Sequence, residues 1–415
     1  MTQPVSPSRP DGPAAQQATT PQFAMRQQNL ARVLHTLAAE GSLSRAAVAT
    51  RIGLTRAAVS TLVEELLRGG LLVEEGPGRS GSVGRPGTQL RLTDRGPCGF
   101  GAEVGVDRLA VCAADLRGEI RVRVEREVRN QQREPAAVLA ELRALAGRAR
   151  AEAVRVGLRP AGLAVAVPGL VTRAGSTVLR APNLGWRDVE LAGLLPTDLG
   201  PVTVHNEASL GGLAELWSRT EPAADSFVYV SAQIGIGASI VVDGHLLAGA
   251  HGFGGELGHV PVRPEGPVCG CGGRGCLETY AGEEAVLRAA GIEPGPGVRL
   301  GALTARCEAD EATALRAVRR AGTALGIALS GAVNLLDPRQ VVIGGTLSRL
   351  APWLLPPLRR ELARRTTVAA GGRPTPLPVT ASPLGPDGPL RGAAGLAVRT
   401  ALDQPATLLA PALPH

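Results

Sequence analysis

Residues 254–280 read GGELGHVPVRPEGPVCGCGGRGCLETY, and this stretch says more about the fold than any other part of the chain. In it His259 is followed by three cysteines, which are Cys269, Cys271 and Cys276. One imidazole and three thiolates are a typical tetrahedral zinc set, and the intervening glycines allow a short loop to fold around an ion. Four ligands within eighteen residues favour a closed structural metal site over a loop of free thiols.

The same stretch carries two acids, Glu256 and Glu278, on either side of the cysteines. Carboxylates accept hydrogen bonds from neighbouring hydroxyl groups, and a site built this way discriminates against ligands that lack those hydroxyls. Two asparagines elsewhere, Asn183 and Asn206, are candidate partners for the same ligand, although an isolated asparagine is ordinarily a turn residue. The two carboxylates suit the neighbouring hydroxyls of a sugar beside the metal loop, whereas the role of the two asparagines depends on the family resemblance described below.

Outward from this stretch, the chain repeats a fold unit. Residues 99–128 and residues 226–249 each predict three short strands, with a glycine at the first turn and a helix-rich segment afterwards. The predicted strands are Phe100–Gly105, Leu109–Asp115, Ile120–Val128, Phe227–Ser231, Ile236–Val242 and His245–Leu247. This order is typical of two α/β lobes with mixed sheets and a ligand site between them. A single α/β lobe with an inserted hairpin is the alternative.

Residues 24–95 differ from the rest of the chain and predict three helices. In the third, which ends near Arg68, the apolar residues recur at helical spacing and mark the buried face: Val59, Leu62, Val63 and Leu66. The opposite face carries small and hydrogen-bonding side chains: Arg56, Ala57, Ser60 and Thr61. This layout indicates a helix-turn-helix whose second helix reads base edges in the major groove.

Two predicted strands, Leu71–Glu74 and Gln89–Leu92, follow that helix around the glycine-rich loop GPGRSGSVGRPG. A two-stranded ribbon in this place is the wing of a winged helix. Its loop carries Arg79 and Arg85, which we expect to contact phosphates or a minor groove. The segment holds ten arginines against six acids, which favours DNA over the alternative of a three-helix bundle used for protein contacts.

Composition excludes several other classes of protein. The 415 residues contain 44% apolar and 20% charged residues, and all 44 basic residues are arginine. Without lysine, a lysine-containing phosphate loop, a pyridoxal Schiff base and a lysine nucleophile are impossible. No stretch is long and apolar enough for a membrane span, and the first residues have no apolar core typical of a signal peptide. We expect a cytoplasmic protein with a disordered tail at 1–23 and another tail at 401–415.

Several motifs together resemble the ROK family of repressors, open reading frames and sugar kinases. They are VPGLV at 167–171, APNLGW at 181–186, QIGIGASIVVDGHLLAGAHGFGGELGH at 233–259 and CGCGGRGCLETY at 269–280. The resemblance covers nearly everything from residue 25 to residue 400. The added winged helix is similar to that of the family's xylose-repressor and N-acetylglucosamine-repressor branch.

The resemblance implies an α/β fold with an N-terminal winged helix-turn-helix at 24–95. A two-lobed, actin-like (ribonuclease H-like) sugar-kinase fold then covers 96–400, with lobes at about 96–205 and 206–400. It further implies structural Zn²⁺ held by four residues: His259, Cys269, Cys271 and Cys276. The implied sugar-binding residues are Asn183, Asn206, Glu207, Glu256, His259 and Glu278.

Two departures from the family pattern bear on catalysis. Family kinases open the first lobe with Asp-x-Gly-x-Thr, whereas this chain reads EVGVDR at 103–108, with the acid Asp107 in place of threonine. Like charges a few ångströms apart cost on the order of 1–4 kcal/mol. The kinases also use an Asn-Asp pair, and here Glu207 takes the aspartate's place as a degenerate base. Moving a carboxylate by about an ångström can cost roughly a hundredfold in rate.

We therefore expect no catalytic residue and no enzyme activity, although residual sugar kinase activity is left open. The expected function is that of a sugar-responsive DNA-binding transcriptional regulator. It would repress carbohydrate uptake or catabolism genes until a sugar effector releases it from its DNA operator. A homodimer or homotetramer is expected, and no membrane partner. The alternatives are an ATP-dependent hexose kinase that carries a DNA-binding domain, and an interaction module that binds neither sugar nor DNA.

Overall fold

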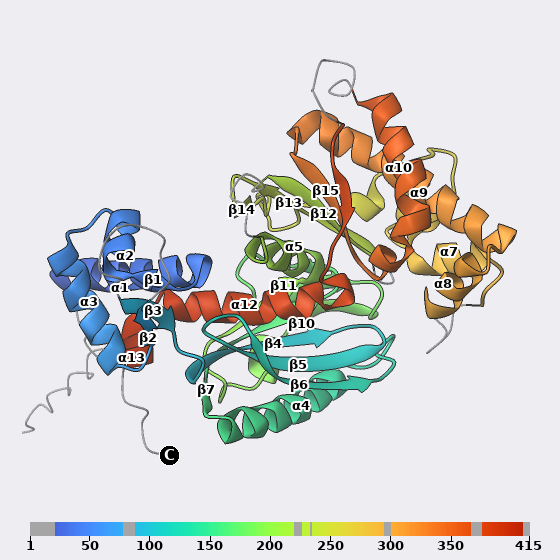
Figure 1. Ribbon diagram of the computed structural model, residues 1–415. Coiled ribbons are helices and arrows are strands. Elements are labelled where there is room, and N and C mark those ends of the chain that lie inside the picture. Colours follow the sequence, from blue (N-terminus) through green and yellow to red (C-terminus); the bar gives the residue numbers. More distant parts are fainter. Residues whose placement is uncertain are drawn as a thin grey trace, which may run out of the picture.

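The computed structural model describes residues 21–77, 88–219, 226–232, 235–293, 300–366 and 376–409. It shows a small helical domain at one end and two larger lobes, each built on its own sheet (Figure 1). One long C-terminal helix, α12 (Gly388–Leu402), runs along the first lobe and ends beside the small domain (Figure 1). Within these ranges no helix is long and apolar enough to cross a lipid bilayer.

The N-terminal domain is a winged helix, as the sequence predicts. Its elements are α1 (Pro21–Glu40), β1 (Leu43–Ser44), α2 (Arg45–Ile52), α3 (Arg56–Arg68), β2 (Leu72–Pro77) and β3 (Thr88–Leu92). The Ser44 and Thr55 hydroxyls cap α2 and α3, and Gly53 ends α2 in a left-handed conformation with φ of 67°. The tail prediction is wrong at residues 21–23, because Pro21 starts α1, a position that proline favours.

The two lobes have the same sheet topology, which confirms the predicted repeat. The first sheet has the order β11-β7-β4-β5-β6, and the second has the order β14-β13-β12-β15-β16. In each, an antiparallel group of three strands is extended by two strands parallel to its first strand. The strands of the first sheet are β4 (Gly96–Val104), β5 (Arg108–Asp115), β6 (Ile120–Glu127), β7 (Leu158–Val167) and β11 (Val202–Asn206). Those of the second are β12 (Phe227–Ala232), β13 (Ile236–Val242), β14 (His245–Leu246), β15 (Gln340–Gly345) and β16 (Val379–Ala381).

The remaining elements cover the sheets. In the first lobe they are α4 (Pro135–Arg155) and the small sheet of β8 (Leu170–Val171), β9 (Thr177–Ala181) and β10 (Trp186–Glu190). In the second lobe they are α6 (Glu278–Ala281), α7 (Glu283–Ala289), α8 (Leu300–Glu308), α9 (Ala312–Leu336) and α10 (Ala351–Arg365). Helix α5 (Glu207–Trp217) packs against both α12 and strands β12 and β13, so it links the two lobes.

The predicted division at 205/206 puts α12 in the wrong lobe. Helix α12 packs on β4 and β7 of the first sheet, opposite to the face that α4 covers. The contact is close because β4 has glycines there, and a Cβ at Gly101 would lie 2.5 Å from the Ala394 backbone nitrogen. The first sheet therefore has its second apolar face covered by a segment that comes from the end of the chain.

The predicted tail at 401–415 is also wrong for residues 401–409. The chain continues from α12 into α13 (Pro405–Leu409), and Leu402 and Leu408 are buried. Both leucines belong to one apolar core with Leu30 and Leu66 of the winged helix and with residues of β5. The winged helix therefore shares its core with the first lobe and the C-terminus, and the Asp403 carboxylate lies 2.6 Å from the His35 ring.

Candidate functional site

The four predicted metal ligands come together in the loop between β14 and α6. Their ligand atoms all lie within 4.8 Å of one another. Around a zinc ion with Zn–S distances of about 2.3 Å, tetrahedral ligand atoms are about 3.8 Å apart. Cys271 Sγ is 3.8 Å from Cys276 Sγ, and Cys269 Sγ is 3.7 Å from His259 Nδ1. The donor set and its spacing thus fit a tetrahedral metal ion.

Backbone turns hold this loop in place. The Cys269 N–H donates to the Gly273 carbonyl, and the Gly273 N–H donates to Cys271 Sγ. Isolated antiparallel bridges join Pro261 to Cys276 and Val268 to Arg274. These contacts hold the two ends of the loop together, so that His259 and the three cysteines meet as the sequence spacing predicts.

The six residues predicted to bind sugar all line one cavity of about 100 Å³ between the lobes. They are Asn183, Asn206, Glu207, Glu256, His259 and Glu278. Asn183 lies in the β9–β10 turn of the first lobe, and Glu278 begins α6 of the second lobe. Cys271 also lines the cavity, so the metal loop forms part of its wall.

His259 stands between the metal loop and the cavity. Its Nδ1 faces Cys269 Sγ, and its Nε2 lies 3.7 Å from the Glu256 carboxylate. Burial raises the pKa of Glu256, and the Glu278 carboxylate raises it further against the opposing effect of His259. A metal ion on Nδ1 would fix the ring so that Nε2 is presented to a ligand.

Asn206 lines the cavity, but most of its side chain is already used. Its Oδ1 accepts hydrogen bonds from the backbone N–H groups of Ala208 and Ser209, which makes it the N-cap of α5. Its Nδ2 donates to the Gly169 carbonyl at 2.8 Å. Asn206 therefore fixes the start of α5 at the cavity, and one N–H of its amide is left over for a ligand.

Sequence reasoning missed Gly235, which also lines the cavity. A Cβ at this position would lie 2.5 Å from Glu278 Oε2 and 3.0 Å from Asn183 Nδ2. The missing side chain is what leaves room for both polar groups to face the cavity. The dense glycines of the 233–259 motif were the available signal, although they do not single out one position.

Glu207 begins α5 at the floor of the cavity. Burial, with a smaller effect of the Glu103 carboxylate, raises the pKa of Glu207 to about 8 against the opposing charge of Arg108. At neutral pH the carboxyl group is therefore mostly protonated.

We predict that Glu207→Gln stabilises the chain more at pH 8.5 than at pH 5. Between the usual pKa of 4.5 and the folded value of about 8, the folded chain holds a proton that the unfolded chain has lost, so stability falls as pH rises. Glutamine removes that loss, and melting curves should show a gain over wild type that grows with pH to at least about 2 °C. An equal gain at both pH values would contradict the raised pKa.

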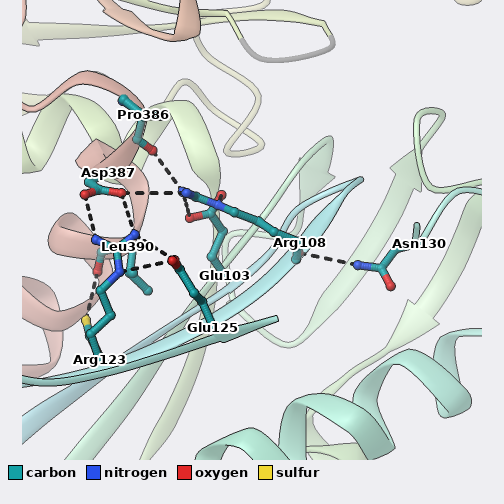
Figure 2. A network of polar contacts seen from close by, with 9 residues as sticks. Glu103, Arg108, Arg123, Glu125, Asn130, Pro386, Asp387 and Leu390 are labelled. Carbon is teal, nitrogen blue, oxygen red and sulfur yellow. Dashed lines mark hydrogen bonds and ion pairs between the residues drawn. The ribbon is translucent and has the colours of Figure 1, made fainter. Parts of the chain in front are cut away.

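The turn after β4, which the sequence matches to the phosphate loop of kinases, is filled by an ion-pair network. Figure 2 shows the Arg108 guanidinium pointing toward the buried Glu103 carboxylate and the segment before α12. Arg108 bonds both Glu103 oxygens, at 3.2 and 2.6 Å, and donates to the Pro386 carbonyl. Asp387 lies 3.6 Å from Arg108 and accepts two hydrogen bonds from Arg123. That Arg108 pairs with Glu103 and Asp387 in this turn was not predicted from the sequence.

The predicted DNA-reading residues lie on the outer face of α3. Arg56, Ala57 and Thr61 are exposed, and Ser60 is half-buried. The four predicted core residues are buried on the opposite face: Val59, Leu62, Val63 and Leu66. Arg79 and Arg85, predicted for the wing loop, fall outside the described residues.

Comparison with known proteins agrees with this architecture. The sequence pattern of the ROK family matches residues 100–400, and that of the MarR family matches residues 31–81. The xylose repressor of Caldicellulosiruptor bescii is 30% identical over 362 residues, which cover 83% of this chain and 90% of the relative. A crystal structure described as a ROK family transcriptional regulator, homolog of the E. coli MLC protein, has a TM-score of 0.75 and 25% identity, covering 93% of this chain and 99% of that one.

A kinase is also among the similar structures. The ROK family glucokinase from Streptomyces griseus, in complex with glucose and AMPPNP, has a TM-score of 0.62 and 26% identity. It covers 72% of this chain and 98% of the glucokinase. The fold and the site therefore define the class of protein: a two-lobed, actin-like sugar-kinase fold joined to an N-terminal winged helix-turn-helix domain. The chain belongs to the ROK family.

Proposed function

We propose that this chain is a sugar-responsive DNA-binding repressor that acts in the cytoplasm as a homodimer or homotetramer. The observation that carries the proposal is the core that the winged helix shares with β5 and α12 of the first lobe. A change in the lobes reaches the DNA-binding domain through packed side chains, since α12 and α13 continue directly into that core. The similarity to xylose repressors supports the same function.

The sugar site of the proposal is the cavity between the lobes. Its polar groups come from both sides, with Asn183 on the first lobe and Glu256 and Glu278 on the second. At about 100 Å³ the cavity is smaller than the lower limit of about 300 Å³ for typical ligand pockets, so a monosaccharide requires the lobes to move. A ligand that prefers one lobe arrangement shifts the protein toward it.

The proposal is tested by measuring operator affinity with a panel of monosaccharides at fixed salt. We expect one of them to weaken operator binding strongly, and nearly complete release requires a preference of about 5 kcal/mol between the two states. If no sugar changes the affinity, the proposed function is wrong.

Zinc is the metal that we propose for the His259 site. Three thiolates and one imidazole suit Zn²⁺ in a closed structural site, where it would crosslink the loop that forms the cavity wall. We predict one zinc per chain by elemental analysis, and a loss of at least about tenfold in sugar affinity when Cys276→Ser or a chelator removes it. As a control, Cys307→Ser changes a buried thiol of α8 outside the cluster and should keep the zinc. Full sugar binding by metal-free protein would contradict this role.

The kinase alternative rests on the likeness to the glucokinase structure. Two features oppose it in this chain. Arg108 and Glu103 fill the turn where phosphates would bind, and Glu207 is one methylene longer than the aspartate base of the family's kinases, which moves its carboxylate by about an ångström. We therefore propose no phosphoryl transfer, and sugar-dependent ATP turnover by zinc-loaded protein would overturn that part of the proposal.

A further inference from the structure

The chain returns from the second lobe to the first through residues 382–387, which join β16 to α12. The beginning of this crossing segment is fixed to the second sheet and to α5. The Ser382 N–H donates to the Ile343 carbonyl of β15 at 2.8 Å, and the Ser382 hydroxyl donates to the buried Glu215 carboxylate of α5 at 2.7 Å. A movement of the second lobe therefore acts directly on the first residue of the crossing segment.

The crossing segment has little slack. The Leu384 N–H donates to the Ser382 hydroxyl at 3.1 Å, and the Asp387 N–H donates to the Leu384 carbonyl at 3.1 Å, so the segment forms a compact turn. The turn leads straight into α12, because Asp387 directly precedes the first residue of that helix. A displacement of Ser382 is thus passed on to Asp387 along a short, hydrogen-bonded path.

The other end of the crossing segment is fixed to the first lobe by charge. Figure 2 shows the Asp387 carboxylate facing the guanidinium groups of both Arg108 and Arg123. Arg123 of β6 donates two hydrogen bonds to it, at 2.7 and 3.0 Å, and the Arg108 guanidinium lies 3.6 Å away. Arg108 also donates to the Pro386 carbonyl at 3.0 Å. We call Arg108, Arg123 and Asp387 the crossing clamp.

Both arginines of the crossing clamp are held in place by further acids. Arg108 bonds both oxygens of Glu103, whose side chain is only 1% exposed, and Arg123 also donates to Glu125 on the same strand. Burial would raise the pKa of Asp387, but the hydrogen bonds and charge of Arg123, together with the charge of Arg108, lower it. The Asp387 carboxylate is therefore charged at neutral pH, and its two-pronged contact with Arg123 fixes its direction as well as its position.

The start of α12 is a meeting point of both lobes. Asp387 occupies the N-cap position but makes no side-chain capping bond, and its carboxylate faces the arginines instead. A Cβ at Gly388 would lie 3.0 Å from the Tyr229 hydroxyl of β12, so the second lobe also touches α12 at its first residue. Further along α12, Val398 and Leu402 lie in the core shared with the winged helix. One helix thus connects the lobe contact with the DNA-binding domain.

We propose that the crossing clamp transmits the sugar-dependent movement of the second lobe to the winged helix. With the clamp in place, a displacement of Ser382 reaches β5 and α12 together, and both elements contribute to the core of the winged helix. Without it, the turn before α12 can bend and absorb the movement. Arg123 and Asp387 are positioning residues, since neither lines the sugar cavity. This inference rests on the proposed function and names the place where the movement enters α12.

The test uses the full chain and compares operator affinity with and without a saturating concentration of the sugar that releases the wild type. We expect Asp387→Asn to reduce this sugar-dependent change at least about tenfold, while sugar affinity without DNA changes less than about threefold. Asparagine is as good a helix N-cap as aspartate, so the variant loses the ion pairs and keeps the helix start. Arg123→Gln should cause a smaller loss, because Arg108 still faces Asp387.

Arg126→Gln provides a matched control. Arg126 lies on β6, like Arg123, and its ion pair with Glu141 of α4, at 3.4 Å, stays within the first lobe. This variant should respond to sugar like the wild type. In the Asp387→Asn background, Arg123→Gln should cause no further loss, because both changes break the same contact. Melting curves of each variant separate this effect from a general loss of stability, which would leave the sugar response of the folded protein unchanged.

Three results would overturn the inference: an equal loss of response in Arg126→Gln, a parallel loss of sugar affinity in Asp387→Asn, or additive losses in the double variant. If no sugar changes the operator affinity of the wild type, the proposed function fails and the inference falls with it. A wild type that responds, together with an Asp387→Asn variant that responds equally, would refute only the crossing clamp.

Discussion

Replacing Ser60 and Thr61 of α3 with alanine is expected to lower affinity for the operator by about a hundredfold, while affinity for unrelated DNA changes little. Both residues lie on the outer face of a helix whose inner face is buried, so their replacement would remove the hydrogen bonds to base edges that we predict without disturbing the core. The operator would be selected by the wild-type protein from random duplexes, and both affinities measured by fluorescence anisotropy.

Thr36→Ala provides a matched control on α1. The Thr36 hydroxyl donates to the backbone carbonyl four residues earlier, as the Thr61 hydroxyl does, but Thr36 is not on the outer face of α3. The control should bind the operator like wild type. Equal losses on operator and unrelated DNA would indicate backbone contacts and contradict the assignment of Ser60 and Thr61 to bases. The salt dependence should stay unchanged, because neither residue carries charge.

Adding one methyl group at Gly235 is expected to abolish the sugar response. The new Cβ would lie 2.5 Å from Glu278 Oε2 and displace it from the cavity, together with the Asn183 amide. Misplacing two hydrogen-bonding groups by an ångström should weaken sugar binding by at least about a hundredfold. Calorimetry with the effector sugar measures the loss, and the operator complex of Gly235→Ala should persist at sugar concentrations that release wild type.

Two variants make this result specific. Gly147→Ala adds the same methyl group on α4, where a Cβ would have no neighbour within 4 Å, and should respond to sugar normally. Glu278→Gln keeps the volume but removes the charge, and should lose much of the affinity while retaining operator binding. A sugar response of Gly235→Ala equal to that of wild type would refute the location of the site.

Local sequence patterns were sufficient to predict most of the elements. Alternating and helical spacing identified the three antiparallel strands of each sheet and the buried face of α3, but not strand β16, because each pattern reports which side of an element faces a core. The six cavity residues were identified through motifs, and the structure brings them together around one cavity. Their roles toward a sugar remain predictions until ligand binding is measured.

Contacts between distant segments were not predictable in this way. Nothing in the sequence near Arg108 indicates that it lies 3.6 Å from Asp387, which is 279 residues away. Likewise, the apolar residues of α12 and α13 match any amphipathic helix, and only the uncovered face of the first sheet and the incomplete core of the winged helix explain where they pack. Fold topology, not local pattern, decides such partners.

The shared core around Leu66, Leu402 and Leu408 has a consequence for retargeting this regulator to new promoters. Replacing residues 21–92 with the winged helix of another repressor would place foreign side chains against α13, and the shared apolar core would pack poorly. A working chimera therefore also needs the other repressor's counterpart of α13. The unit to exchange thus comprises the winged helix and the C-terminal helix together. For the same reason, an affinity tag is safer after residue 409 than a truncation before it.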